Sequence, residues 1–238
     1  MKNLIKLQLR NATHQKMTYI CLLLTILIGP AILLLSDLFV SAQPEAKAWP
    51  EIVKFIGTQI DIVGLIFIAI FSCLDFSEGT IKNIISRGYS KEKYLVSKII
   101  VVTIALFAMY IVCSLILFVY YIRNGLGFDI DLFKQLLVVL LNIITISTFY
   151  TTISVLLEKN SSAIIACVVL PVLIPLLLGL ISIKFNIDLN SYWISSLPSN
   201  YLEKKTIKNL MFSVFGSIIY IFISLVAGNI LIKKKEIK

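Results

Sequence analysis

Six long apolar runs alternate with shorter polar stretches along the 238-residue chain. Each run is close to the roughly 20 residues that an α-helix needs to cross the hydrocarbon core of a membrane. The pattern therefore predicts an all-α membrane protein with a single transmembrane domain over residues 1–238. The predicted spans cover residues 18–35, 53–74, 99–121, 133–157, 162–183 and 211–232.

The longest charged insertion between two apolar runs covers residues 75–98. Within it, apolar side chains recur at helical spacing and form a short stripe: Ile81, Ile84, Ile85 and Tyr89. Ser77 is suited to cap the start of a helix, and Gly88 is suited to end it. We therefore predict a short helix over about residues 77–88, between the second and third spans, with a polar face free for a partner.

Two further segments are expected at the membrane surface. Residues 1–17 carry Lys2, Lys6 and Arg10 at a spacing of four, which places their charges on one side of an N-terminal interfacial helix. A solvated basic tail is the alternative. Residues 184–210, between the last two spans, mix apolar residues with proline and predict short helices at the outer surface.

Asp61 is the one acid that we place within an apolar run. An ionised group at the centre of a span costs about 2.5–3.5 kcal/mol on insertion scales, so it usually faces a bundle interior or water. Asp61 shares a helix face with Gly57 and Gly64, and this face is expected to line a translocation path or a helix interface. Alternatively, the span begins later and Asp61 lies near the outer headgroups.

The fourth span carries several polar side chains on neighbouring faces. Asn142 has no internal partner and is expected to face protein or water, whereas Thr145, Thr148 and Thr152 share one helix face. Hydroxyl groups can bond back to the preceding turn of a helix, so they tolerate lipid and often serve helix packing. A polar lining for a substrate and simple packing therefore both remain open for these residues.

Prolines predict kinks in two of the spans. Pro30 lies within the first span, directly after a glycine. Pro171 and Pro175 lie one turn apart in the fifth span and remove two hydrogen bonds of the helix. In a membrane, such gaps are tolerated where neighbouring helices or cavity water satisfy the freed backbone groups. The fifth span is therefore expected to be a bent helix.

The composition agrees with a membrane protein. Hydrophobic residues make up 58% of the chain, charged residues make up 15%, and the mean hydropathy is +0.94. The net charge of +9 indicates basic cytoplasmic loops rather than nucleic-acid binding, because most of the 22 Lys and Arg residues lie on the side that holds both chain ends. The excess of bases on that side predicts that both termini are cytoplasmic.

Several kinds of catalytic site are excluded by their missing residues. The chain has no G-x-x-x-x-G-K-[ST] phosphate loop, and His14 is its one histidine. Four cysteines lie in or beside apolar runs without a C-x-x-C pair, and we expect them to be small buried hydrophobes: Cys21, Cys73, Cys113 and Cys167. We expect no catalysis, cofactor or metal in this chain.

The insertion between the second and third spans resembles the first cytoplasmic loop of type-2 ABC exporter permeases. The matching residues are Glu78-Gly79-Thr80, Lys82, Arg87-Gly88, Lys91 and Ser97-Lys98. In that family this loop holds a coupling helix, which docks in a groove of the ATP-hydrolysing subunit. The resemblance implies that five residues contact that subunit: Glu78, Gly79, Thr80, Lys82 and Arg87. A positive loop that only fixes topology is the alternative.

A second local motif, Leu-Pro-Ser-Asn-Tyr-Leu at residues 197–202, is similar to an outer re-entrant element of the same permeases. With the span count and loop lengths, the resemblance covers the whole chain. It implies that the chain is one permease half of an ABC transporter, paired with a second half as a homodimer or heterodimer. ATP and Mg would be bound by a cytoplasmic ATPase partner.

The resemblance also implies export across a bacterial plasma membrane. Small six-span relatives export antibiotics, lantibiotic-type peptides and amphipathic toxins, so the expected substrate is an amphipathic or antimicrobial peptide, a toxin or a drug. Such export would give antibiotic resistance or immunity. Two other functions stay open, namely a proton-coupled secondary transporter that uses Asp61 and a non-transporting membrane immunity protein.

Overall fold

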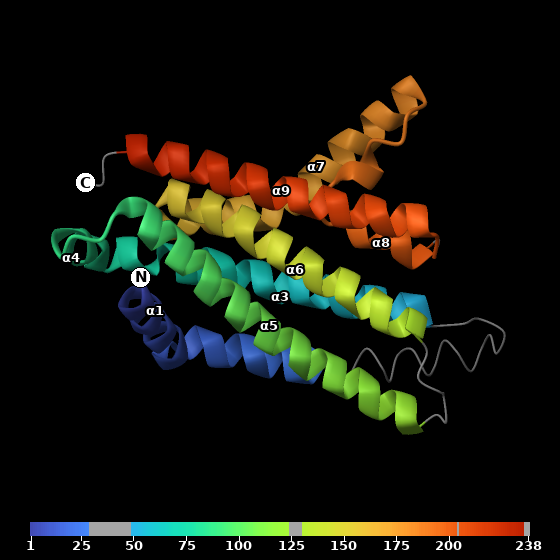
Figure 1. The fold of residues 1–238 in the computed structure, drawn as a ribbon, viewed down its shortest axis with the longest axis horizontal. Coiled ribbons are helices and arrows are strands. Elements are labelled where there is room, and N and C mark those ends of the chain that lie inside the picture. The colour runs from blue at the N-terminus through green and yellow to red at the C-terminus, as the bar shows by residue number, and fades with distance from the viewer. Residues whose placement is uncertain (29–48, 124–129, 204, 236–238) are drawn as a thin grey trace.

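The computed structural model describes residues 1–28, 49–123, 130–203 and 205–235, and for residues 49–61 it describes the backbone alone. These parts form a bundle of long helices without any strand (Figure 1). The helices are α1 (Lys2–His14), an apolar helix at Lys16–Ile28, α3 (Trp49–Ser77), α4 (Thr80–Ser86), α5 (Lys91–Arg123), α6 (Ile130–Leu157), α7 (Asn160–Phe185), η1 (Asn190–Tyr192, a 3-10 turn), α8 (Leu197–Glu203) and α9 (Ile207–Lys234).

Four described helices are long and apolar enough to cross a membrane, namely α5, α6, α7 and α9. A fifth candidate is the segment Ile62–Ser77 together with α4, which bends by 68° at the break between them. The predicted all-α membrane fold is therefore confirmed, but the count of six spans is not. The first predicted span, residues 18–35, is described only to Ile28.

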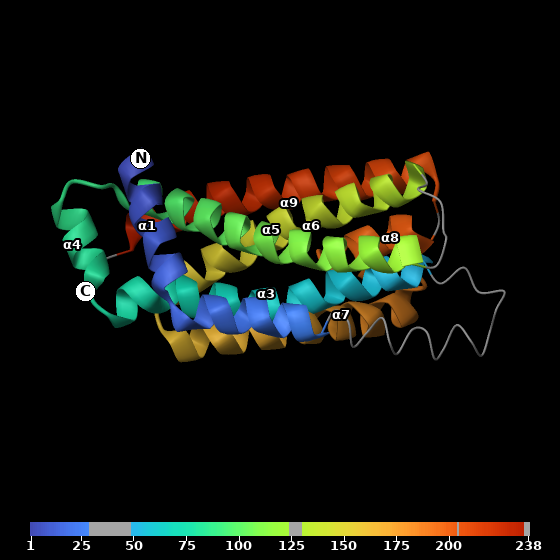
Figure 2. The same ribbon diagram turned by 90° about the horizontal axis from the view of Figure 1, so that it is seen from below.

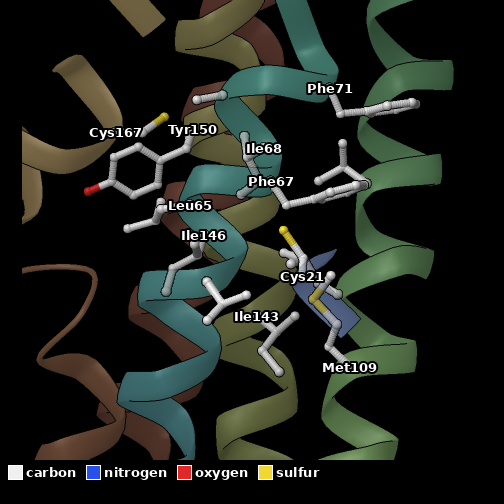
Figure 3. Close-up of a cluster of buried hydrophobic side chains, with 14 of the residues drawn as sticks. Cys21, Leu65, Phe67, Ile68, Phe71, Met109, Ile143, Ile146, Tyr150 and Cys167 are labelled. Atoms are coloured by element: carbon white, nitrogen blue, oxygen red, sulfur yellow. The ribbon is translucent and has the colours of Figure 1, made fainter. Parts of the chain in front are cut away.

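Helix α6 forms the centre of the bundle, where it packs against α3, α5, α7 and α9 (Figures 1 and 2). Most of the apolar part of α6 is buried, whereas almost all of α7 is exposed. Apolar side chains of α3, α5 and α6 interlock around this centre (Figure 3). Phe67 and Phe71 stack with their ring centroids 5.4 Å apart, and Cys21 and Met109 lie beside them.

Three described glycines, Gly64, Gly216 and Gly228, allow close approach between helices. A Cβ atom at Gly64 would lie 2.7 Å from Leu106 Cδ2 on α5. A Cβ atom at Gly228 on α9 would lie 2.6 Å from Thr152 Cγ2. Gly64 therefore serves helix packing, in agreement with one of the two interpretations of its helix face.

Four parts of the chain lie together at one end of the bundle, which we call the α4 end (Figures 1 and 2). They are the start of α1, helix α4, the turn between α6 and α7, and the end of α9. Ion pairs join the end of α9 to the turn between α6 and α7 and to the start of α5. Lys235 Nζ lies 3.2 Å from Glu158 Oε1, and Lys233 Nζ lies 2.6 Å from Glu92 Oε1. The parts that were predicted to be cytoplasmic thus share one end of the molecule.

Short helices also form where the sequence predicted them, between α7 and α9. α8 buries Leu197, Tyr201 and Leu202 and packs against α9 and α6. α9 then begins at Thr206, whose side chain accepts a hydrogen bond from the amide of Asn209 and so caps the helix. Whether α8 re-enters a membrane stays a prediction.

Candidate functional site

The short helix of the polar insertion begins and ends at glycines. α4 has seven residues and begins after Gly79, whose φ of 67° is in the left-handed region. It ends at Ser86, and the capping residue Arg87 is followed by Gly88 with a φ of 84°. Residues with a side chain rarely adopt this backbone conformation, so glycine allows the sharp turn on each side of α4.

The predicted bounds of this helix, residues 77–88, were too wide at both ends. Ser77 is the last residue of α3, and its hydroxyl donates to the carbonyl of Leu74 instead of capping α4. This happens because α3 continues past the end of the apolar run and stops only at the turn through Gly79. The helix itself and its position between two long helices are as predicted.

The apolar side of α4 packs onto the bundle. Ile81 and Ile84 are 2% and 5% exposed, while Ile85 and Tyr89 are partly buried. The two buried isoleucines belong to a cluster contributed by α1, α5, α6 and α9: Leu4, Tyr94, Leu95, Ile99, Val155 and Ile232. The predicted apolar stripe is therefore confirmed, and it joins α4 to an apolar cluster at this end of the bundle.

The polar side of α4 faces away from the bundle. Of the five residues that the permease resemblance assigns to ATPase contact, Glu78, Gly79, Lys82 and Arg87 are exposed. Thr80, the fifth, is partly buried and turns inward. Four of these residues are thus exposed, within and beside α4.

Thr80 contacts a buried pair of opposite charges, which was not predicted from the sequence. Its hydroxyl lies 3.1 Å from Asp75 Oδ1 and 3.3 Å from the Asp75 carbonyl oxygen. Asp75 Oδ2 accepts hydrogen bonds from Gln8 Nε2 at 2.8 Å and from the Tyr94 hydroxyl at 3.0 Å, and it lies 3.0 Å from Lys98 Nζ. We call these five residues the Asp75 centre.

Lys98 neutralises the buried carboxylate. The side chains of Asp75 and Lys98 are both completely buried. The ammonium group also donates to the Phe71 carbonyl at 2.9 Å and lies 3.9 Å from the centroid of the Phe71 ring, a cation–π contact. A buried ion pair requires such additional partners, because removing two charges from water costs several kcal/mol per ion.

The sequence interpretation placed Asp75 and Lys98 at the two ends of the charged insertion, just outside the predicted spans, and it did not predict their burial. α3 extends to Ser77 and α5 begins at Lys91, so both residues lie inside helices that pack together. One signal was available. An acid ends one apolar run and a base begins the next, and two consecutive spans that pack side by side bring these positions to the same level of adjacent helices.

The residues proposed to line a translocation path are buried in the bundle. Asn142, Thr145, Thr148 and Thr152 are at most 5% exposed. Each threonine hydroxyl donates to the carbonyl four residues earlier, at 2.9, 2.7 and 2.8 Å in chain order. These bonds satisfy the hydroxyls within α6, as helix packing requires. A role in a translocation path stays a prediction.

The remaining predicted residues lie partly outside the described structure. Pro30 lies in the undescribed residues, and the side chain of Asp61 is not described. Pro171 and Pro175 lie within α7, whose last part projects away from the other helices (Figure 1). The four cysteines are buried and unpaired, as expected. In the described ranges, no group of three His, Cys, Asp or Glu residues could hold a metal ion.

The chain belongs to the DUF2705 family, which is described as a protein of unknown function and whose sequence pattern matches residues 16–238. No curated protein matches the chain. The family match thus includes α3, α4 and α5, and it begins after the end of α1.

Proposed function

We propose that this chain is one membrane-spanning half of an ATP-driven ABC exporter, and that α4 docks on the ATPase. The observation that supports this most is how α4 is held. Its apolar side is buried in a cluster that also holds side chains of α1, α5, α6 and α9, and its polar residues are exposed. A loop that only connected two spans would not need a rigid helix with an organised outer surface.

The outer surface of α4 offers both signs of charge within one short segment. Glu78 precedes the helix, Lys82 lies within it, and Arg87 directly follows it, and all three are exposed. Charged groups at the rim of an interface mainly set orientation and partner choice. This pattern suits a partner that must bind in one orientation.

The energy for transport would come from another chain. No phosphate loop occurs in the sequence, so a cytoplasmic subunit would bind ATP and Mg. A second permease half, identical or different, would complete the transporter within the lipid bilayer. Little of the apolar part of α7 or of α9 is buried inside the bundle, so both helices could contact lipid or that second half.

The substrate that we propose is an amphipathic or antimicrobial peptide, a toxin or a drug. Such molecules partition into the bilayer, so they could enter sideways between helices without a large outer domain. The setting would be a bacterial plasma membrane with both termini in the cytoplasm, and the outcome would be resistance or immunity.

The test is a pull-down of the detergent-solubilised full chain from its native cells, with partners identified by mass spectrometry. We expect a stoichiometric cytoplasmic ATPase, which the double variant Glu78→Lys/Arg87→Glu should lose because both docking charges are reversed. Its control is Asp188→Lys/Lys205→Glu, which reverses two exposed charges near the other end of the bundle and should retain the ATPase.

The rival functions predict other results. A chain that is recovered alone in mild detergent, and whose transport follows the pH gradient, would favour a proton-coupled transporter. Asp61→Asn would then abolish transport. Peptide binding without any dependence on ATP would instead favour an immunity protein.

A further inference from the structure

The Asp75 centre connects four helices through one carboxylate. α4 contributes Thr80, α3 contributes Asp75 itself, α5 contributes Tyr94 and Lys98, and α1 contributes Gln8. None of these side chains is needed for the exposed docking surface of α4. The centre therefore requires an explanation of its own.

α4 depends on tertiary contacts for its orientation. A helix of seven residues is too short to be stable alone in water. A two-residue break with a bend of 68° separates it from α3, and no side chain caps its first turn. Its apolar contacts through Ile81 and Ile84 are not directional. The hydroxyl of Thr80, at the first residue of the helix, makes a directional contact with Asp75.

The chemistry of the centre favours one geometry. Apolar residues of similar volume often replace a buried ion pair without loss of stability, so stability alone does not account for the charges. A carboxylate with four donors has a defined arrangement for each partner, since every donor must keep its distance and angle. If one donor moved away, the buried carboxylate of Asp75 would lose a hydrogen bond. The centre thus resists movement of any one helix relative to the others.

We propose that Asp75 is a positioning residue that makes α4 and the adjoining ends of α1, α3 and α5 move as one unit. The inference rests on the proposed function in one respect, namely that a docked ATPase displaces α4. The Asp75 centre then passes this displacement to the long helices. Lys98 supplies the charge that keeps the carboxylate ionised inside the bundle.

The proposal also gives α1 a role beyond contact with headgroups. Leu4, Gln8 and Ala12 form its buried stripe at a spacing of four residues. Gln8 lies in the middle of this stripe and donates directly to Asp75. α1 therefore belongs to the same mechanical unit as α4, although 67 residues separate Gln8 from Asp75 in the chain.

The test uses a matched pair of variants at Thr80. Thr80→Val keeps the shape of the side chain and removes the hydroxyl, whereas Thr80→Ser keeps the hydroxyl. Hydrogen exchange is measured on the purified full chain in lipid nanodiscs. In Thr80→Val the α4 amides should exchange about tenfold faster, as expected for one lost hydrogen bond, while α6 is unchanged. Thr80→Ser should match the original chain.

A second readout measures coupling in the complex with the ATPase. Tyr94→Phe removes a donor on α5 and leaves all five residues assigned to ATPase contact unchanged. It should therefore still capture the ATPase but transport several-fold less substrate per ATP hydrolysed. Thr80→Val should lower this ratio as well, and Thr80→Ser should keep it at the original value. A merely structural role would change the amount of folded protein and leave the ratio unchanged.

Two results would overturn the positioning role. One is unchanged exchange of the α4 amides in Thr80→Val, and the other is Thr80→Ser behaving like Thr80→Val. Failure of the proposed function would be visible separately, as the absence of any ATPase with the original chain. The exchange measurement needs no partner, so it decides in either case whether the Asp75 centre holds α4.

Discussion

Replacing Lys98 by methionine removes one half of the buried ion pair at little change in side-chain length. Asp75 would keep its carboxylate in a completely buried position. Three neutral donors would remain around it, from Gln8, Thr80 and Tyr94. The variant therefore tests how much of the stability of the α4 end depends on neutralising one charge.

Removing one partner of a buried pair typically costs about 3–5 kcal/mol, because the other charge stays buried without compensation. Because three hydrogen bonds to the carboxylate remain, we expect Lys98→Met to lower the free energy of unfolding by about 3 kcal/mol, the lower end of this range. Adding Asp75→Asn removes the orphaned charge and keeps one acceptor oxygen. The double variant should therefore regain at least about 2 kcal/mol, although it carries one substitution more.

The assay is unfolding by SDS from mixed micelles, followed by the fluorescence of the buried Trp193. Lys93→Met is the control, since Lys93 is an exposed lysine on the same helix and its loss should change the stability by less than about 0.5 kcal/mol. A loss below about 1 kcal/mol in Lys98→Met would refute the reasoning. A double variant that is no more stable than Lys98→Met would refute it as well.

Two further predictions concern packing and topology. Gly228→Ala should lower the free energy of unfolding by about 1–3 kcal/mol, because its Cβ would lie 2.6 Å from Thr152 Cγ2. Gly179→Ala should leave the free energy of unfolding unchanged, because no atom lies within 4 Å of the added Cβ. Equal losses of stability for the two variants in the same SDS titration would contradict close packing at Gly228. An impermeant maleimide should label Ser86→Cys in inverted vesicles and Tyr192→Cys in intact cells, whereas the native cysteines stay unlabelled. The opposite labelling pattern would place α4 outside the cell.

Features that depend on local sequence could be predicted well. The apolar runs predicted long helices because their length matches a membrane, and the spacing of Ile81 and Ile84 predicted a buried side for the helix that contains them. The helix ends were less certain, since a serine such as Ser77 suits both the start of one helix and the last turn of another. In the structure α3 extends to Ser77, so this serine belongs to the last turn of α3 and does not begin α4.

The Asp75 centre could not be predicted from residue types alone. Charged residues beside an apolar run are usually solvated, so Asp75 and Lys98 were assigned to the loop. Their burial depends on the pairing of α3 with α5 and on Gln8, which comes from a distant part of the chain. Long-range contacts of this kind leave no periodic pattern in the sequence.

The docking role of α4 is tested most directly by site-specific photo-crosslinking in native cells. A photoreactive amino acid is placed at the exposed position of Lys82, and a matched one is placed at Gly179, on the largely exposed helix α7. We predict a covalent adduct between position 82 and a cytoplasmic ATPase, and none from position 179. The absence of an ATPase adduct at position 82, in cells where the chain is folded in the membrane, would contradict the proposed function.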